Sequence, residues 1–180
     1  EAKMKGLSPN PKEAFAMSEY QGTFKRYEKK YLVTQQQYNA LAKVFAARMV
    51  PDRFAESTIS NIYYDTPDFR LIRRSLDRPA YKEKLRLRTY RTPGADTEAF
   101  VEIKKKYDHI VYKRRVAMTY SEAQAYLDGG AAPEQSQISR EIDWFLHFYK
   151  GIQPAMCICY DRLALFDKYQ PELRVTFDSG

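Results

Sequence analysis

The chain has 180 residues, of which 44% are hydrophobic and 29% are charged, a balance typical of one folded domain with a sizeable core. Its net charge of +7 indicates an anionic partner, such as a phosphate compound, a nucleic acid or a membrane surface. No apolar run is as long as a membrane span and no secretory signal is visible, so we expect a cytoplasmic protein without a span of its own. A membrane partner remains open.

The first part of the chain predicts a leader, a strand and a helix. Residues 1–22 show weak periodicity and are interpreted as a leader segment, with the folded domain at 23–180. The stretch 24–33 alternates charged and aromatic side chains, which predicts a strand. Thr34 opens a capping-box pattern, and apolar residues then recur at helical spacing, so we expect an amphipathic helix over 34–49.

The middle of the chain predicts several strands. Residues 58–67 are β-branched and aromatic before Asp-Thr-Pro ends the run, which indicates a strand. Residues 69–79 are interpreted as a short helix or an irregular crossing. Strands are predicted over 81–91 and 98–107, separated by the turn sequence of 91–96.

The last third predicts strands on both sides of two helices. A strand over 109–120 follows its predecessor through a tight turn. Helices are expected at 121–130 and 136–151, each ended by glycine. Two strands, 154–167 and 172–178, complete the pattern. The fold class expected from these elements is α+β with an antiparallel sheet.

The strand YKEKLRLRTYR (81–91) has two different faces. One carries four cations, Lys82, Lys84, Arg86 and Arg88, and the other carries leucines. A sheet with one solvated charged face is a common arrangement. However, charges of one sign directly opposite each other destabilise a sheet, and no carboxylate interrupts this row.

Other predicted strands repeat this division into a charged and an apolar face. If the sheet closes, the charged faces line its interior and the apolar faces meet helices outside. Cations at short range repel, and a bound polyanion relieves the repulsion. Arginine and lysine both suit phosphate oxygens, so the pattern predicts a tunnel that is lined by cations and binds phosphate. Glu28 and Glu102 could hold a divalent cation or orient the basic side chains.

Several blocks of the sequence occur in the order and spacing of a known domain. They are RYEKKYLV, IYYDTPDF, RPAYKEKLRLRTY, FVEIKKKY, YKRRV, SREIDWF, YDRLALF and LRVTFD, spread over about residues 24–178. On these blocks the chain resembles the VTC domain, the polyphosphate polymerase domain of the vacuolar transporter chaperone family. The family has bacterial members, and we expect this chain to be one of them.

The resemblance implies a triphosphate tunnel metalloenzyme fold, an antiparallel eight-stranded β-barrel with helices packed outside. It also implies phosphate-binding positions, to which Lys84 is added from the charged face of 81–91. The expected set is Lys30, Lys84, Arg86, Arg88, Lys104, Lys113, Arg115, Tyr160, Arg162 and Arg174. Within this set the residues expected to serve catalysis are Arg86, Arg88, Lys104 and Arg162.

The resemblance implies polymerase chemistry with Mn²⁺ or Mg²⁺. ATP would give its γ-phosphoryl group to a growing polyphosphate chain. Two alternatives stay open: hydrolysis of triphosphate or polyphosphate on the same fold, and a non-catalytic module that binds polyphosphate or inositol phosphate. Nucleic acid is not expected as a partner, because it favours cations and aromatic residues interleaved on an open surface.

The chain departs from the family pattern at its C-terminal end. The family continues past the T-F-D block with strands that supply a metal-binding glutamate. Seven strands are predicted here, so we expect the barrel to be incomplete within these residues and the main metal ligand to lie beyond residue 180. Glu28 and Glu102 are then secondary candidates for binding the metal.

Overall fold

The computed structural model describes residues 23–24, 29–108 and 110–180. Its strands are β1 (Thr23–Phe24), β2 (Met49–Asp65), β3 (Tyr81–Tyr90), β4 (Glu98–Tyr107), β5 (Ile110–Thr119), β6 (Gln153–Asp167) and β7 (Arg174–Ser179). Its helices are α2 (Gln35–Arg48), α3 (Arg70–Leu76), α4 (Tyr120–Leu127) and α5 (Gln137–Phe148). The predicted α+β class is therefore confirmed.

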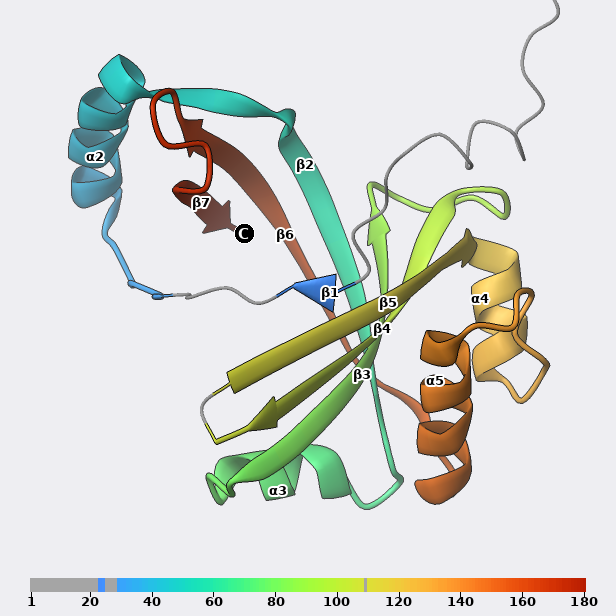
Figure 1. Cartoon of the computed structure of the whole chain (residues 1–180). Helices are drawn as coiled ribbons and strands as arrows, with labels where there is room; N and C mark the ends of the chain where they lie inside the picture. Colours follow the sequence, from blue (N-terminus) through green and yellow to red (C-terminus); the bar gives the residue numbers. More distant parts are fainter. Residues whose placement is uncertain (1–22, 25–28, 109) are drawn as a thin grey trace, which may run out of the picture.

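All seven strands belong to one antiparallel sheet. Their order is β1-β5-β4-β3-β2-β6-β7, so sequential strands are mostly neighbours. The sheet is strongly curled, and its edge strands β1 and β7 lie on the side of β2 away from α4 and α5 (Figure 1). Within the described residues β1 and β7 each pair with one neighbour, which gives a half-barrel of seven strands. Closure by an eighth strand stays a prediction.

The helices begin where the sequence supplies capping groups. Thr34 Oγ1 accepts a hydrogen bond from the amide of Gln37, whose side chain accepts one from the Thr34 amide, a reciprocal cap that starts α2. Thr119 and Glu122 form the same arrangement at α4. Asp65, at the end of β2, accepts hydrogen bonds from two backbone amides of the first turn of α3.

The hydrophobic core lies between the outer face of the sheet and three helices. Leu85 and Leu87 of β3 are 0% and 1% exposed. Helix residues that pack over this face are Leu71, Ala123, Tyr126, Leu127, Ile142 and Phe145. The remaining helix, α2, contacts the same outer side at the other end of the sheet, where Tyr38 meets Phe177 at 4.8 Å between ring centroids. The apolar faces of the strands are thus covered by helices, as predicted.

Two strand predictions need correction. The strand expected over 24–33 is present only as Thr23–Phe24 in the described residues, and 29–34 has no regular structure. A strand requires a hydrogen-bonding neighbour, and within the described part of this segment only Thr23 and Phe24 pair with β5. In contrast, β2 begins at Met49 instead of residue 58, because β6 pairs with Met49–Pro51 before an irregularity in register.

None of the described helices is long and apolar enough to cross a membrane. The cytoplasmic location remains a prediction.

Leu87→Ala should destabilise the fold strongly. The side chain is 1% exposed in the core beneath the helices, so truncation removes buried methyl groups and leaves a cavity. The expected loss is about 2–5 kcal/mol in the free energy of unfolding, measured by urea denaturation. Leu76→Ala is the control, since Leu76 is 73% exposed. Its effect should stay within about 0.5 kcal/mol, and equal losses in the two variants would contradict the assignment of the core.

Candidate functional site

Four polar or charged residues lie opposite one another across four neighbouring strands. The strand register places Tyr63 opposite Arg86, Arg86 opposite Glu102, and Glu102 opposite Arg115. Side chains two residues apart share a face of a strand, so this row lies on the face opposite to Leu85 and the helix-covered core. Helices α3, α4 and α5 cover the other face of the curled sheet (Figure 1). We call the face that carries the row the inner face.

Glu102 is the centre of the inner face. Its side chain is 1% exposed and has three basic partners. Arg86 approaches Oε2 with Nε at 2.6 Å and Nη2 at 2.5 Å. Near Oε1 lie Lys113 Nζ at 3.4 Å and Arg115 Nη1 at 3.8 Å. One buried carboxylate therefore faces three cations and offsets only part of their charge.

The cations and the carboxylate shift each other's ionisation. Burial raises the pKa of Glu102, but the charges of Arg86, Arg88 and Lys113 outweigh burial and hold that pKa below its ordinary value. Burial also lowers the pKa of Lys113 to about 8, although Glu102 opposes the shift. The charge of Lys113 therefore changes close to pH 8.

Arg88 is held by uncharged groups. It is 6% exposed, and its Nε donates to Asn61 Oδ1 at 2.9 Å. The hydroxyl of Tyr160 accepts from Nη2 of Arg88 and from Nη2 of Arg162, each at 3.4 Å. Arg162 also forms a two-pronged ion pair with Asp178, at 2.6 and 2.7 Å. Through Tyr160, the cluster extends from β3 across β2 to β6.

A row of lysines lies beside the arginine row. The register places Lys84 opposite Lys104 and Lys104 opposite Lys113, on three adjacent strands. Like charges directly opposite each other in a sheet are destabilising. Lys104 is exposed and Lys84 is half-buried, so water screens part of this repulsion. The row still adds positive charge to the inner face.

Aromatic rings support the arginines. The Tyr63 hydroxyl accepts from Nη1 of Arg86 at 3.2 Å. The guanidinium carbon of Arg115 lies 4.7 Å from the centre of the Phe100 ring, and that of Arg162 lies 5.2 Å from the Tyr160 ring. These are distances at which a cation is attracted to a ring face. The arginine side chains are therefore oriented before any ligand arrives.

The structure brings most, but not all, of the expected phosphate-binding residues together. The inner face holds Lys84, Arg86, Arg88, Lys104, Lys113, Arg115, Tyr160 and Arg162. Arg174 shares a face of β7 with Asp178, the partner of Arg162, and it forms an ion pair with Asp52 at 3.1 Å. Lys30 is exposed in the irregular segment 29–34, not in a strand. Glu28 lies outside the described residues.

The described residues contain no ready cluster of ligands for a divalent cation. Mg²⁺ is usually bound by one or two carboxylates together with water molecules and substrate phosphates. No group of three or more His, Cys, Asp or Glu residues lies together in the described part of the chain. Of the two carboxylates expected to bind the metal, Glu102 lies within the described residues. It is already surrounded by Arg86, Lys113 and Arg115. Its position favours orienting the basic side chains, which was the other role predicted for it.

Two residues of the site were missed in the sequence. Asn61 and Tyr63 belong to the predicted strand ISNIYYD, but neither was singled out there. A signal was present, because Asn61 is a polar residue at the centre of an apolar strand, and a buried amide requires partners. The partner could not be named without the register that places Asn61 opposite Arg88.

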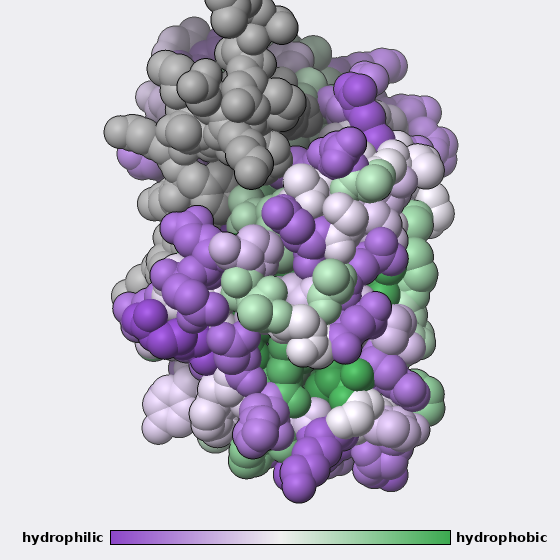
Figure 2. Space-filling model, turned by 90° about the vertical axis from the view of Figure 1, so that its right-hand side faces the viewer, coloured by the Kyte–Doolittle hydropathy of each residue, from purple (hydrophilic) through white to green (hydrophobic). Residues whose placement is uncertain are grey.

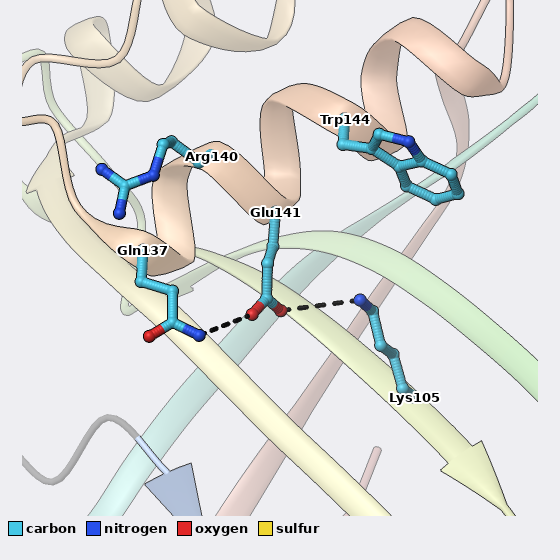
Figure 3. Close-up of a pocket in the computed structure, with 5 residues that line it drawn as sticks. All are labelled: Lys105, Gln137, Arg140, Glu141 and Trp144. Atoms are coloured by element: carbon cyan, nitrogen blue, oxygen red, sulfur yellow. Dashed lines mark hydrogen bonds and ion pairs between the residues drawn. The ribbon is translucent and has the colours of Figure 1, made fainter.

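A second hollow lies on the outer side of the molecule, between α5 and β4. It has a volume of about 310 Å³ and is lined by Lys105, Gln137, Arg140, Glu141 and Trp144. In Figure 3, Glu141 points toward Lys105 and Gln137, while Arg140 and Trp144 extend separately. Figure 2 shows this side of the molecule as largely hydrophilic, with a small apolar area in its lower half. This hollow gathers fewer basic residues than the inner face, which is therefore the stronger candidate for an anionic ligand.

The curled antiparallel sheet and its basic inner face are the arrangement expected of a tunnel-type fold. The family model of the VTC domain matches residues 25–180, so the chain belongs to the VTC domain family. A comparison with curated proteins finds no match.

Two solved structures resemble the chain. One is described as a candidate adenylate cyclase from Bacillus halodurans, with a TM-score of 0.61, 15% identity, and coverage of 88% of this chain and 74% of that one. The other, also described as a candidate adenylate cyclase, is from Vibrio parahaemolyticus. Its TM-score is 0.47 at 14% identity, and it covers 88% of this chain and 68% of that one. The first likeness supports the tunnel-type fold.

Lys113→Met should change how stability depends on pH. The pKa of Lys113 falls from 10.5 to about 8 on folding, so the unfolded chain binds more protons between these two values. Stability of the wild type should therefore rise as pH increases from about 8 to 10.5. The methionine variant should be more stable than the wild type at pH 7, with a difference that shrinks over this interval.

Urea denaturation at several pH values measures this effect. Lys150→Met is the control for loss of one positive charge at an exposed position. A difference between wild type and Lys113→Met that stays constant from pH 7 to 10.5 would show that Lys113 ionises normally in the folded protein.

Proposed function

We propose that the inner face binds a linear polyphosphate and the triphosphate of ATP. The observation that supports this proposal is the excess of positive over negative charge around Glu102. Four basic residues, Arg86, Arg88, Lys113 and Arg115, gather on one face, and a single buried carboxylate lies among them. A partly enclosed surplus of positive charge favours a ligand with several closely spaced negative charges.

The geometry supports a chain-shaped ligand more than a compact one. Successive rows of the inner face are two residues apart along each strand, which corresponds to about 7 Å. The lysine row, the Arg86 row and the Arg88 row follow one another in this direction. A phosphate chain that runs along the strands can therefore contact lysines and arginines in sequence. Multi-donor arginines suit its oxygens, and lysines add point charges.

The proposed reaction is phosphoryl transfer from ATP to a polyphosphate end. A terminal oxygen of the acceptor chain forms a bond to the γ-phosphorus, the bond from that phosphorus to the β,γ-bridging oxygen breaks, and ADP leaves. In phosphoryl transfer the protein contributes mainly positioning and electrostatic stabilisation. Arg86, Arg88, Lys104 and Arg162 would contact the phosphates in this reaction. No step is assigned to a metal ion, because the described residues contain no group of three or more acidic, histidine or cysteine ligands.

One observation favours binding without catalysis as a second candidate function. Glu102 is engaged by cations and the described residues lack a group of acidic metal ligands. A protein with this arrangement could hold polyphosphate without transferring phosphate.

An assay with ATP separates these functions. The protein is incubated with ATP and Mn²⁺, the ion implied by the family resemblance, and the products are run on a gel stained for polyphosphate. We expect a ladder of polyphosphate products and stoichiometric ADP. Free phosphate without a ladder would indicate a hydrolase. No turnover, together with retained binding of polyphosphate, would indicate a binding module.

Arg88→Ala should weaken phosphate binding while the fold persists. The variant removes a buried, multi-donor cation, and hydrogen bonds to charged groups contribute about 1.5–3 kcal/mol each. The affinity for tripolyphosphate should fall roughly 10- to 150-fold, measured by calorimetric titration. Arg114→Ala removes the same charge from the outer side, where Arg114 pairs with Glu141. It should bind nearly as tightly as the wild type, and equal losses in both variants would mean that only net charge matters.

A further inference from the structure

The side chain of Asn61 connects two parts of the inner face. It lies on β2, between β3 and β6, and is 1% exposed. Its Oδ1 accepts a hydrogen bond from Nε of Arg88 at 2.9 Å. Its Nδ2 donates to the backbone carbonyl of Ile158 at 3.3 Å. One buried amide thus ties the guanidinium of β3 to the backbone of β6.

The identity of this residue is chemically specific. An amide side chain offers an acceptor and a donor at once, whereas a carboxylate offers only acceptors. Aspartate at position 61 could receive the hydrogen bond from Arg88, but it could not donate to Ile158. Aspartate would also place a negative charge beside Arg88. Asparagine satisfies both neighbours and leaves the charge of Arg88 intact.

Arg86 and Arg88 are held in opposite ways. Arg86 is bound by the carboxylate of Glu102, which offsets its charge. Arg88 is bound by the neutral groups of Asn61 and Tyr160. These contacts use two of the five N–H donors of a guanidinium. The hydrogen bond from Nε to Asn61 fixes the orientation of the guanidinium plane. The remaining N–H donors of Arg88 therefore point in fixed directions.

We propose that Asn61 is a positioning residue that orients Arg88 toward the phosphate ligand without neutralising it. This inference rests on the proposed function of the inner face, and it adds a residue that acts through Arg88. An arginine that is already ordered loses less side-chain entropy when it binds phosphate. Asn61 therefore raises affinity without a contact to the ligand.

A double-mutant cycle on tripolyphosphate binding tests the proposal. Asn61→Leu removes both hydrogen bonds at similar volume, and Arg88→Ala removes the group that Asn61 orients. Calorimetric titration should show that Asn61→Leu weakens binding roughly 10-fold in the wild-type background, the effect of one lost hydrogen bond to a charged group. In the Arg88→Ala background, the same substitution should have almost no effect. An equal loss in both backgrounds would overturn the proposal.

Ser60→Leu is the matched control. Ser60 is the neighbour of Asn61 on β2, and its side chain lies on the opposite face, against Cys159. This variant should bind tripolyphosphate as the wild type does. A roughly 10-fold loss in Ser60→Leu would show that any apolar substitution in β2 disturbs the site, and would overturn a specific role of Asn61.

Asn61→Asp provides a test if the leucine variant does not fold. It is nearly the same size and retains an acceptor for Arg88, but it adds the charge that the proposal excludes. Its affinity should fall by at least 10-fold, and its binding should depend less on salt than that of the wild type, because one positive charge is offset. Wild-type affinity in this variant would overturn the proposal. If the wild type itself fails to bind tripolyphosphate, the proposed function fails first and this inference fails with it.

Discussion

The buried ion-pair cluster around Glu102 is the interaction on which the inner face depends. Without the carboxylate, the cations of β3 and β5 would face one another across β4 with no negative charge between them, and their repulsion would destabilise the folded chain. A second carboxylate would reduce the surplus of positive charge and weaken its attraction for anions. One carboxylate among several cations stabilises the folded chain while it preserves a surplus of positive charge. Stability of the fold favours more negative charge at this position, whereas binding of an anion favours less.

The outer packing determines where this charge is displayed. Residues alternate between the two faces of a strand, so burying Leu85 and Leu87 under the helices directs Arg86 and Arg88 to the inner face. The same relation holds on β4, where Val101 and Ile103 are buried in the core and Glu102 points inward. A one-residue shift in register would exchange the faces. The hydrophobic core thus fixes the location of the site, although it supplies none of the site's polar groups.

Local patterns predicted the elements and the two faces, because alternation and capping depend only on neighbouring residues. The helix of 34–49 and the cationic face of 81–91 were found in this way. Long-range pairing was not predictable in the same manner. Arg174 pairs with Asp52, in a part of β2 that contains proline and was not expected to form a strand. The role of Asn61 can be inferred only from the strand register, which places it opposite Arg88.

The two arginines of β3 show how one face can combine stability with binding. Arg86 is paired with a carboxylate, so part of its attraction for an anion is already used within the protein. Arg88 is ordered by an amide and a hydroxyl, which hold its geometry and leave its charge available. A ligand with one negative charge could satisfy Arg88 alone, and the surplus on Lys113 and Arg115 would remain. A phosphate chain presents charge at regular intervals and can satisfy these cations together, so we expect the inner face to favour extended polyanions over ligands with a single charge.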